Sequence, residues 1–142
     1  MSGMPSIKSR EIKIVQEIPI SKTLKFWEGL KEGKIYATKC IKCGKRYFPP
    51  AADCPSCLNS EMEWIELSSK AEVETFTHVV FRPTSFCQYK PYTVAIGRLR
   101  EDVKVLAWLT GFKLSEIKVG MKVRLMAKLS QEGNLTYEFV PL

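Results

Sequence analysis

The stretch that decides the fold runs from residue 40 to residue 57 and reads CIKCGKRYFPPAADCPSC. It contains two Cys-x-x-Cys pairs, Cys40 with Cys43 and Cys54 with Cys57, which are ten residues apart. A pair at this spacing brings two thiolates onto one metal ion at about 2.3 Å, and two pairs complete a tetrahedron. Four thiolates leave no open position for water or substrate. The sequence therefore predicts a structural metal site rather than a catalytic one.

The residues after each cysteine pair, and the other roles that paired cysteines can have, limit which kind of site this stretch forms. Gly44 and Asn59 follow the two pairs, at positions where a tight turn favours a positive φ angle. Zinc is the expected ion, and iron is the alternative because tetrahedral thiolate sites suit both metals. Two disulfides would require an oxidising compartment, and a thioredoxin-like redox pair would need one Cys-x-x-Cys in a βαβ setting, which this stretch lacks.

Composition and charge restrict the class of protein. None of the apolar runs in the 142 residues approaches the roughly 18 needed to span a bilayer, and Met1 to Arg10 lacks the apolar core of a secretory signal. A cytoplasmic protein is expected, whose five cysteines are metal ligands or free thiols. The net charge of +7 suits nucleic acid, phosphorylated small molecules or an acidic protein surface, or it is simply a solvated basic surface.

The chain divides into four predicted parts. Residues 1–20 are expected to form an extended arm that can include one strand. Residues 21–34 are expected to hold a short amphipathic helix, at about 22–32, with Leu24, Trp27 and Leu30 on one face and Gly33 as its terminator. Residues 35–68 form the predicted zinc ribbon, and residues 69–142 form the predicted barrel.

The barrel prediction rests on alternating apolar residues. Five segments alternate in this way, and their members are Val73, Thr75, Thr77, Val79 and Phe81; Tyr92, Val94 and Ile96; Val103, Val105, Ala107 and Leu109; Val123, Leu125, Ala127 and Leu129; and Leu135, Tyr137 and Phe139. Five short half-buried strands favour a small closed barrel. A helix at Leu114–Ile117 followed by a turn at Gly120 is the layout of an OB-fold, and an SH3-like barrel is the main rival. The predicted fold class is mainly β, with a zinc ribbon followed by a five-stranded OB-fold barrel.

The sequence offers little for catalysis. Cys87 lies in a predicted loop, and the only histidine that could activate it, His78, is expected on the barrel surface. Glu72 and Glu74 alternate on one strand and are expected to be solvated carboxylates. A non-catalytic protein is therefore predicted.

Nucleic-acid binding is the alternative function. OB-folds bind single strands on the face of their second and third strands, which here span residues 92–98 and 103–109. Tyr92 and Trp108 are expected to stand isolated among aliphatic residues on this face. The face therefore favours apolar packing over a row of stacked bases, which places nucleic acid second.

A combination of short motifs extends over most of the chain. The motifs are Phe26-Trp27-Glu28-Gly29-Leu30, Gly33-Lys34, Cys40-x-x-Cys43-Gly44, Tyr47-Phe48-Pro49-Pro50, Cys54-Pro55-x-Cys57, Glu63-Trp64, Pro91-Tyr92-Thr93-Val94-Ala95 and Ile117-x-Val119-Gly120-Met121-x-Val123. Together they resemble the acyl-CoA-associated family that joins an OB-fold to a rubredoxin-like zinc ribbon and was long catalogued only as a domain of unknown function. The resemblance runs from about Ser21 to Pro141.

The resemblance implies a role in acyl-CoA metabolism. It implies partnership with enzymes of the thiolase superfamily and, in archaeal members, a complex with thiolase and hydroxymethylglutaryl-CoA synthase. There the small protein is a scaffold that helps to bind the CoA-linked intermediate. Other members of the family sit beside aldolases or hydratases that act on acyl-CoA. A structural zinc ion and a CoA or acyl-CoA ligand are the expected bound groups.

A CoA site needs cations for phosphates and an apolar channel for pantetheine. Lys45 and Arg46 follow the first cysteine pair and are expected to supply charge on a rigid hairpin. Phe26 and Trp27 are expected to supply an apolar wall, and Arg82 opens the loop after the first barrel strand. These residues form the predicted CoA site.

Overall fold

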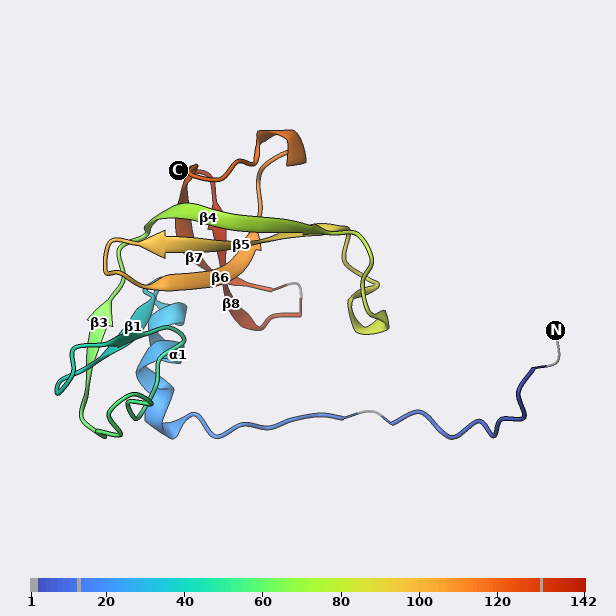
Figure 1. The fold of residues 1–142 in the computed structure, drawn as a ribbon, viewed down its shortest axis with the longest axis horizontal. Coiled ribbons are helices and arrows are strands. Elements are labelled where there is room, and N and C mark those ends of the chain that lie inside the picture. The colour runs from blue at the N-terminus through green and yellow to red at the C-terminus, as the bar shows by residue number, and fades with distance from the viewer. Residues whose placement is uncertain (1–2, 13, 131) are drawn as a thin grey trace.

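The computed structural model describes residues 3–12, 14–130 and 132–142, and it has one α-helix and two β-sheets in these residues (Figure 1). The elements are η1 Ser21–Thr23, α1 Leu24–Lys31, β1 Tyr36–Cys40, β2 Arg46–Tyr47, β3 Met62–Glu66, β4 Lys70–Val79, η2 Thr84–Phe86, β5 Tyr92–Leu99, β6 Lys104–Leu109, η3 Leu114–Glu116, β7 Lys122–Leu129 and β8 Leu135–Val140. None of the helices in the described residues is long and apolar enough to cross a membrane.

The arm and the helix differ from the expectation in detail. The described residues of the arm are exposed and extended, and they form no strand, so the strand suggested for residues 1–20 is absent from them. Residues 1, 2 and 13 of that prediction lie outside the described residues. The helix is shorter than 22–32 because its first turn is the 3-10 turn η1. Gly33, with φ +77°, ends α1 as predicted, and the Lys34 amide donates to the Gly29 carbonyl at 2.7 Å.

The first sheet is the ribbon. Its strand order is β2-β1-β3, with both pairs antiparallel, and Thr38 of β1 lies opposite Tyr47 and Trp64. Gly44 has the positive φ angle that was predicted, at +73°. After the second cysteine pair the positive φ falls on Leu58, not on Asn59, because the turn closes one residue earlier, where the Leu58 amide donates to the Cys54 carbonyl.

The second sheet is a closed barrel with the strand order β4-β5-β6-β8-β7. The pair β6 and β8 is parallel and the other neighbours are antiparallel. This order, with η3 between β6 and β7, confirms the OB-fold and excludes the SH3-like rival. The expected helix at Leu114–Ile117 is a single 3-10 turn, Leu114–Glu116.

The inward face of β5 is the opposite of the one predicted. Thr93, Ala95, Gly97 and Leu99 are buried, whereas Tyr92, Val94 and Ile96 are only half-buried and point outward. The barrel interior takes the small residues of β5 because Phe139 of β8 fills the centre, where a Cβ on Gly97 would stand 2.6 Å from the ring.

A β-bulge corrects the prediction for the first barrel strand. The register of β4 against β5 shifts between Val73 and Thr75, so the inward face changes there. Val73 is buried and Thr75 is exposed, and Phe81, predicted to share their face, is 97% exposed. The same shift turns His78 partly inward, where its Nδ1 atom is hydrogen-bonded to Thr93 Oγ1 at 3.0 Å, so His78 is a half-buried residue of the barrel surface.

The ribbon, the helix and the barrel share one hydrophobic core. Phe26 of α1 lies edge-on to Phe48 of the ribbon and to Tyr137 of β8, with ring centroids 5.9 and 6.2 Å away. Arg46 of the ribbon donates to the Glu101 carbonyl in the turn between β5 and β6, at 2.8 Å. These contacts fix the ribbon against one end of the barrel.

Candidate metal centre and ligand groove

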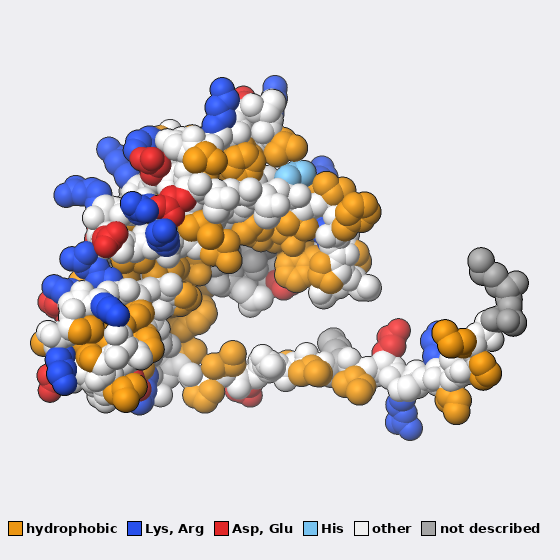
Figure 2. Space-filling model, in the orientation of Figure 1, with side chains coloured by type: hydrophobic (Ala, Val, Ile, Leu, Met, Phe, Trp, Pro, Cys, Tyr) orange, Lys and Arg blue, Asp and Glu red, His pale blue; other side chains and the backbone are white. Residues whose placement is uncertain are grey.

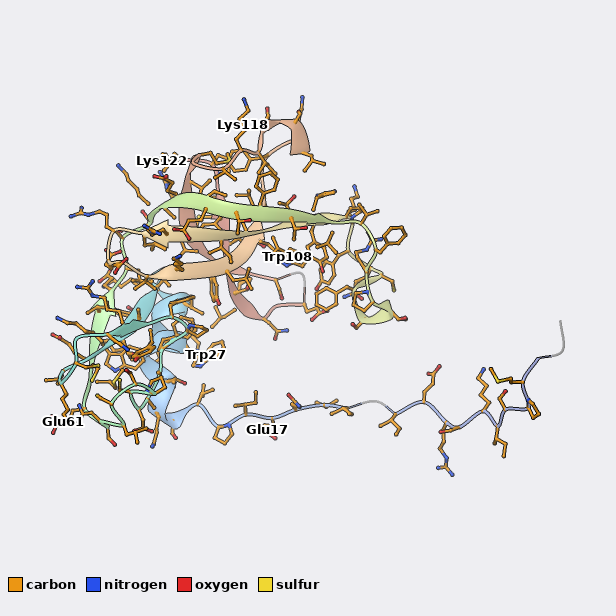
Figure 3. All side chains as sticks on the ribbon, viewed as in Figure 1. Glu17, Trp27, Glu61, Trp108, Lys118 and Lys122 are labelled. Carbon is orange, nitrogen blue, oxygen red and sulfur yellow. The ribbon has the colours of Figure 1, made fainter. Side chains whose placement is uncertain are left out.

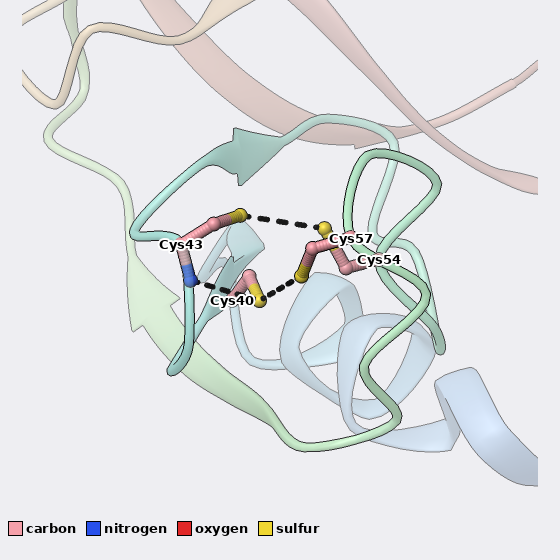
Figure 4. Close-up of side chains that lie close together, drawn as sticks. All are labelled: Cys40, Cys43, Cys54 and Cys57. Atoms are coloured by element: carbon pink, nitrogen blue, oxygen red, sulfur yellow. Dashed lines mark hydrogen bonds between the residues drawn. The ribbon is translucent and has the colours of Figure 1, made fainter.

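The four paired cysteines converge on one point (Figure 4). Their Sγ atoms all lie within 4.8 Å of one another. Cys40 lies 3.5 Å from Cys57, and Cys43 lies 3.6 Å from Cys54, measured between Sγ atoms. Cys40 ends β1, Cys43 closes the turn toward β2, and the second pair comes from the loop that leads to β3. The antiparallel pairing of β1 with its two neighbours brings the pairs together.

Hydrogen bonds stabilise the thiolate forms. The Cys43 amide donates to Cys40 Sγ at 3.5 Å, which lowers the pKa of the Cys40 thiol. The Tyr47 hydroxyl donates to Cys54 Sγ at 3.2 Å, which lowers the pKa of Cys54 to about 6 and raises the pKa of Tyr47 to about 12. The Asn59 backbone amide lowers the pKa of Cys57, but burial and the neighbouring Cys40 thiol outweigh it and raise that pKa to about 11 without a metal ion. The all-sulfur donor set, with two thiols held toward their deprotonated form, fits a structural zinc ion.

A groove of about 630 Å³ lies where the helix meets the barrel. Its lining comes from α1, β6, the β7–β8 hairpin and the loop between β4 and β5, and consists of Trp27, Leu30, Phe86, Tyr89, Leu106, Ala107, Trp108, Thr110, Lys128, Leu129, Ser130, Leu135, Thr136, Tyr137 and Glu138. Trp27 enters from α1 and Trp108 from β6 (Figure 3). The groove therefore gathers residues that are distant in the sequence.

The groove is mainly apolar, with a few polar groups. Glu138 accepts hydrogen bonds from Lys128 Nζ and Thr110 Oγ1, both at 2.9 Å. The Trp27 Nε1 atom is buried and has no acceptor among the described residues. A buried donor without a partner is costly, so a ligand acceptor would gain from bonding to it once the indole ring turns this buried atom toward the groove.

Four aromatic side chains form a cluster beside the groove. Tyr92 and Trp108 stack with centroids 4.3 Å apart, Tyr89 lies edge-on to Trp108 at 5.3 Å, and Phe86 lies 5.7 Å from Tyr89. Tyr92 and Trp108 are therefore not isolated, contrary to the prediction. Val94, not Tyr92, lies directly opposite Trp108, so the stacking is diagonal and could be found only with the register known.

The structure separates the residues predicted to bind CoA. Phe26 is buried in the core and does not line the groove, whereas Trp27 does. Lys45 and Arg46 lie on the ribbon, where Lys45 Nζ donates to Ser56 Oγ at 2.6 Å. Arg82 lies in the loop at the opposite end of the eight-residue strand β5, about 23 Å away along the strand. The three cations are therefore not brought together.

The remaining candidates have other surroundings than expected. Glu72 pairs with Lys122, and Glu74 pairs with both Arg98 and Lys104, so neither is simply solvated. The Lys104 ammonium and the Arg98 guanidinium beside it lower the pKa of Glu74. Cys87 is an exposed thiol in the loop that follows η2.

Comparisons with known proteins agree with this architecture. Residues 27–63 match a family model described as the ChsH2 rubredoxin-like zinc ribbon domain, and residues 64–128 match one described as the ChsH2 C-terminal OB-fold domain. A DUF35 domain-containing scaffold protein from Methanocaldococcus jannaschii is 31% identical over 119 residues, which cover 80% of this chain and 84% of the relative.

Two further relatives are less similar. The benzoylsuccinyl-CoA thiolase subunit BbsA of Thauera aromatica is 30% identical over 73 residues, which cover 51% of this chain and 49% of that subunit. A solved chain titled Ltp2-ChsH2(DUF35) aldolase superposes with a TM-score of 0.73 at 21% identity, over 89% of this chain and 98% of that chain. The second likeness shows the same fold.

Proposed function

Because this chain belongs to the family that joins the ChsH2 zinc ribbon to the ChsH2 OB-fold and includes DUF35 domain-containing scaffold proteins, we propose that it is a non-catalytic scaffold subunit of an acyl-CoA enzyme complex. Its partner is an enzyme of the thiolase superfamily, a proposal supported by the relative named as a thiolase subunit. Hydroxymethylglutaryl-CoA synthase is a second proposed partner, on the resemblance of the chain to archaeal members of the family.

The groove is the observation that carries the proposal. Its volume of about 630 Å³ and its mostly apolar lining suit a pantetheine arm with a short acyl group. The amide carbonyls of pantetheine are acceptors that the unpaired Trp27 Nε1 could use. Lys128 and Thr110 both donate to Glu138, and a carboxylate held in this way suits binding better than acid–base chemistry.

The phosphates of CoA need cations near the groove. Lys128 lines it, and Arg82 lies on the loop that also carries Phe86 and Tyr89. We assign the phosphates to these two cations. Lys45 and Arg46, at the ribbon end, are the competing assignment from the sequence.

The metal site has a supporting part in this proposal. Cys40, Cys43, Cys54 and Cys57 would hold the zinc ion, which when bound supplies a closed structural centre. The ribbon positions Phe48, whose ring lies 5.1 Å from that of Tyr137, a residue of the groove wall. The cysteines thus keep that wall in place rather than act on substrate.

Calorimetry with acetyl-CoA tests the binding site. We expect Trp27→Ala to weaken binding about 10- to 100-fold, from the loss of a large apolar contact. The double variant R82A/K128A should weaken it about tenfold or more, and Lys118→Ala, which removes an exposed cation on another loop, should leave it unchanged. If K45A/R46A weakens binding and R82A/K128A does not, the phosphates lie at the ribbon. If purified chain binds no CoA ester, the ligand proposal fails.

Nucleic-acid binding stays as the second candidate because of the aromatic cluster. Tyr92 and Trp108 stack on the outer face of β5 and β6, where OB-folds present aromatic platforms to single strands. Binding to an oligonucleotide that weakens with salt and is lost in Trp108→Ala, without CoA binding, would favour this function.

A further inference from the structure

The arm carries the sequence pattern of a strand. Residues 11–20 read EIKIVQEIPI. One parity holds four isoleucines and a glutamine, and the opposite parity is mostly polar: Ile12, Ile14, Gln16, Ile18 and Ile20 against Glu11, Lys13, Val15, Glu17 and Pro19. An apolar face that recurs every second residue is typical of a strand with one side buried.

The structure leaves this apolar face in solvent. Ile12 is 84% exposed, Ile14 77% and Ile18 70%. Figure 2 shows hydrophobic side chains spaced along the arm, away from the barrel. A single strand is not stable by itself in water. The arm would therefore form a strand only when it pairs with the edge of a sheet.

The described part of this chain offers no edge of matching length. The ribbon sheet ends in β2, with two residues, and in β3, with five, and in the closed barrel residues 74–79 of β4 have no partner on the β7 side. Ten extended residues span about 33 Å, whereas β3 spans about 17 Å and residues 74–79 span about 20 Å. A second copy of the chain offers the same short edges and its own arm, and two arms alone would form only a marginally stable two-stranded ribbon. The arm therefore fits a longer edge on a different protein.

Pro19 indicates which side of the arm would face that edge. Backbone groups of alternate residues point to opposite sides of a strand, and proline lacks the N–H donor. With Pro19 on the outer side, the isoleucines of the other parity bond to the edge through their backbones. Pro19 then also blocks the addition of a further strand, as it does on natural edge strands.

We propose that residues 11–20 dock as an added strand on an exposed sheet edge of the partner enzyme. The isoleucine side chains enter an apolar groove beside that edge, and Glu11 and Glu17 stay in solvent. The partner is thus a protein with an unpaired strand of about ten residues next to apolar surface. This inference rests on the proposed function for the identity of the partner.

The test compares two faces of the arm in the full chain. Tagged chain is purified from its own cells, and the thiolase-superfamily enzyme that accompanies it is quantified by mass spectrometry. I14D/I18D should lower the amount of co-purified enzyme at least tenfold. E11Q/E17Q, which changes two residues of the other parity, should leave that amount unchanged. The melting temperature and acetyl-CoA affinity of I14D/I18D should equal those of the parent, because both side chains are largely exposed.

The outcomes separate the two proposals. If I14D/I18D retains the enzyme, the arm proposal is overturned and the scaffold function stands. If a different protein co-purifies with the parent and is lost with I14D/I18D, the arm proposal stands and the thiolase partner is wrong. If no stable partner co-purifies with the parent, the arm proposal and the scaffold function are both wrong. If light scattering shows a dimer that I14D/I18D dissociates, the arm binds a second copy and the proposal is overturned.

Discussion

A methyl group at position 97 would test how tightly the barrel is packed. Gly97 lies on the inward face of β5, against the fully buried ring of Phe139. A Cβ there would stand 2.6 Å from Phe139 Cζ, 3.0 Å from Cε1 and 3.3 Å from the Cβ of Ala71. Ordinary contacts begin near 3.4 Å, so Gly97→Ala forces the ring to move by about 0.8 Å in a core without free space.

The size of the effect follows from two opposing terms. Overpacking a core costs about 1–3 kcal/mol, and replacing a strand glycine by alanine returns about 0.5–1 kcal/mol through the unfolded chain. We expect a net loss of about 1–2 kcal/mol. For a chain of this size that loss lowers the melting temperature by about 3–8 °C.

Differential scanning calorimetry measures this change. Gly3→Ala is the matched control, because a Cβ on Gly3 meets no atom within 4 Å, and it should melt with the parent. Phe139→Leu removes part of the clash, so the pair G97A/F139L should lose less stability than the sum of the single variants. A Gly97→Ala protein as stable as the parent, with additive effects in the pair, would show that the barrel centre is not packed as described.

Three further predictions concern the metal centre and the barrel charges. Tyr47→Phe should weaken metal binding about 10- to 100-fold, measured by competition with a zinc indicator, because the hydroxyl holds Cys54 as a thiolate. Chelation, or Cys54→Ser, should unfold the ribbon before the barrel in amide hydrogen exchange; equal protection in both sheets would contradict this. The lowered pKa of Glu74 stabilises the fold above its unfolded pKa of about 4.3, and that stability is lost as pH falls through the folded pKa, so Glu74→Gln should flatten acid melting curves between pH 5 and pH 3. Glu132→Gln, which changes an exposed carboxylate outside this ion-pair cluster, is the control and should not flatten the curves.

Much of the fold could be predicted from sequence patterns that lie within single segments. The family resemblance, the ribbon and the five-stranded OB-fold are confirmed, because the cysteine spacing and the alternation along β6, β7 and β8 are set within each segment. The domain boundaries stay predictions. The faces of β4 and β5 were wrong because they depend on distant residues. The bulge after Val73 changes parity without any mark in the sequence, and Phe139 of β8 forces small residues inward on β5.

The candidate site divides in the same way. The cysteine quartet could be read from spacing, since each Cys-x-x-Cys turn is local. The groove could not, because Trp27, Trp108 and Tyr137 meet only after the barrel closes and α1 packs on it. Grouping Arg82 with Lys45 and Arg46 assumed a nearness that the length of β5 rules out. A signal for the groove was present in three aromatic residues that lie close together in the sequence, Phe86, Tyr89 and Tyr92. The first two line the groove, and Tyr92 stacks on Trp108 beside it.

The parts of the molecule differ in how much they are packed, and this difference suits the proposed scaffold role. A ligand groove holds its shape only if its walls are fixed. Here Phe48, which belongs to the ribbon with the four cysteines, packs on Phe26 and Tyr137 in the shared core. The described residues of the arm are exposed and lack such packing, and the arm precedes α1, the helix that carries Trp27. Binding of the arm to a partner would therefore hold the helix end next to that partner's surface. If the groove binds acyl-CoA and the arm binds the partner, as proposed, one continuous stretch of chain carries both a groove wall and a docking segment, and the protein would place a ligand beside an enzyme without taking part in the chemistry.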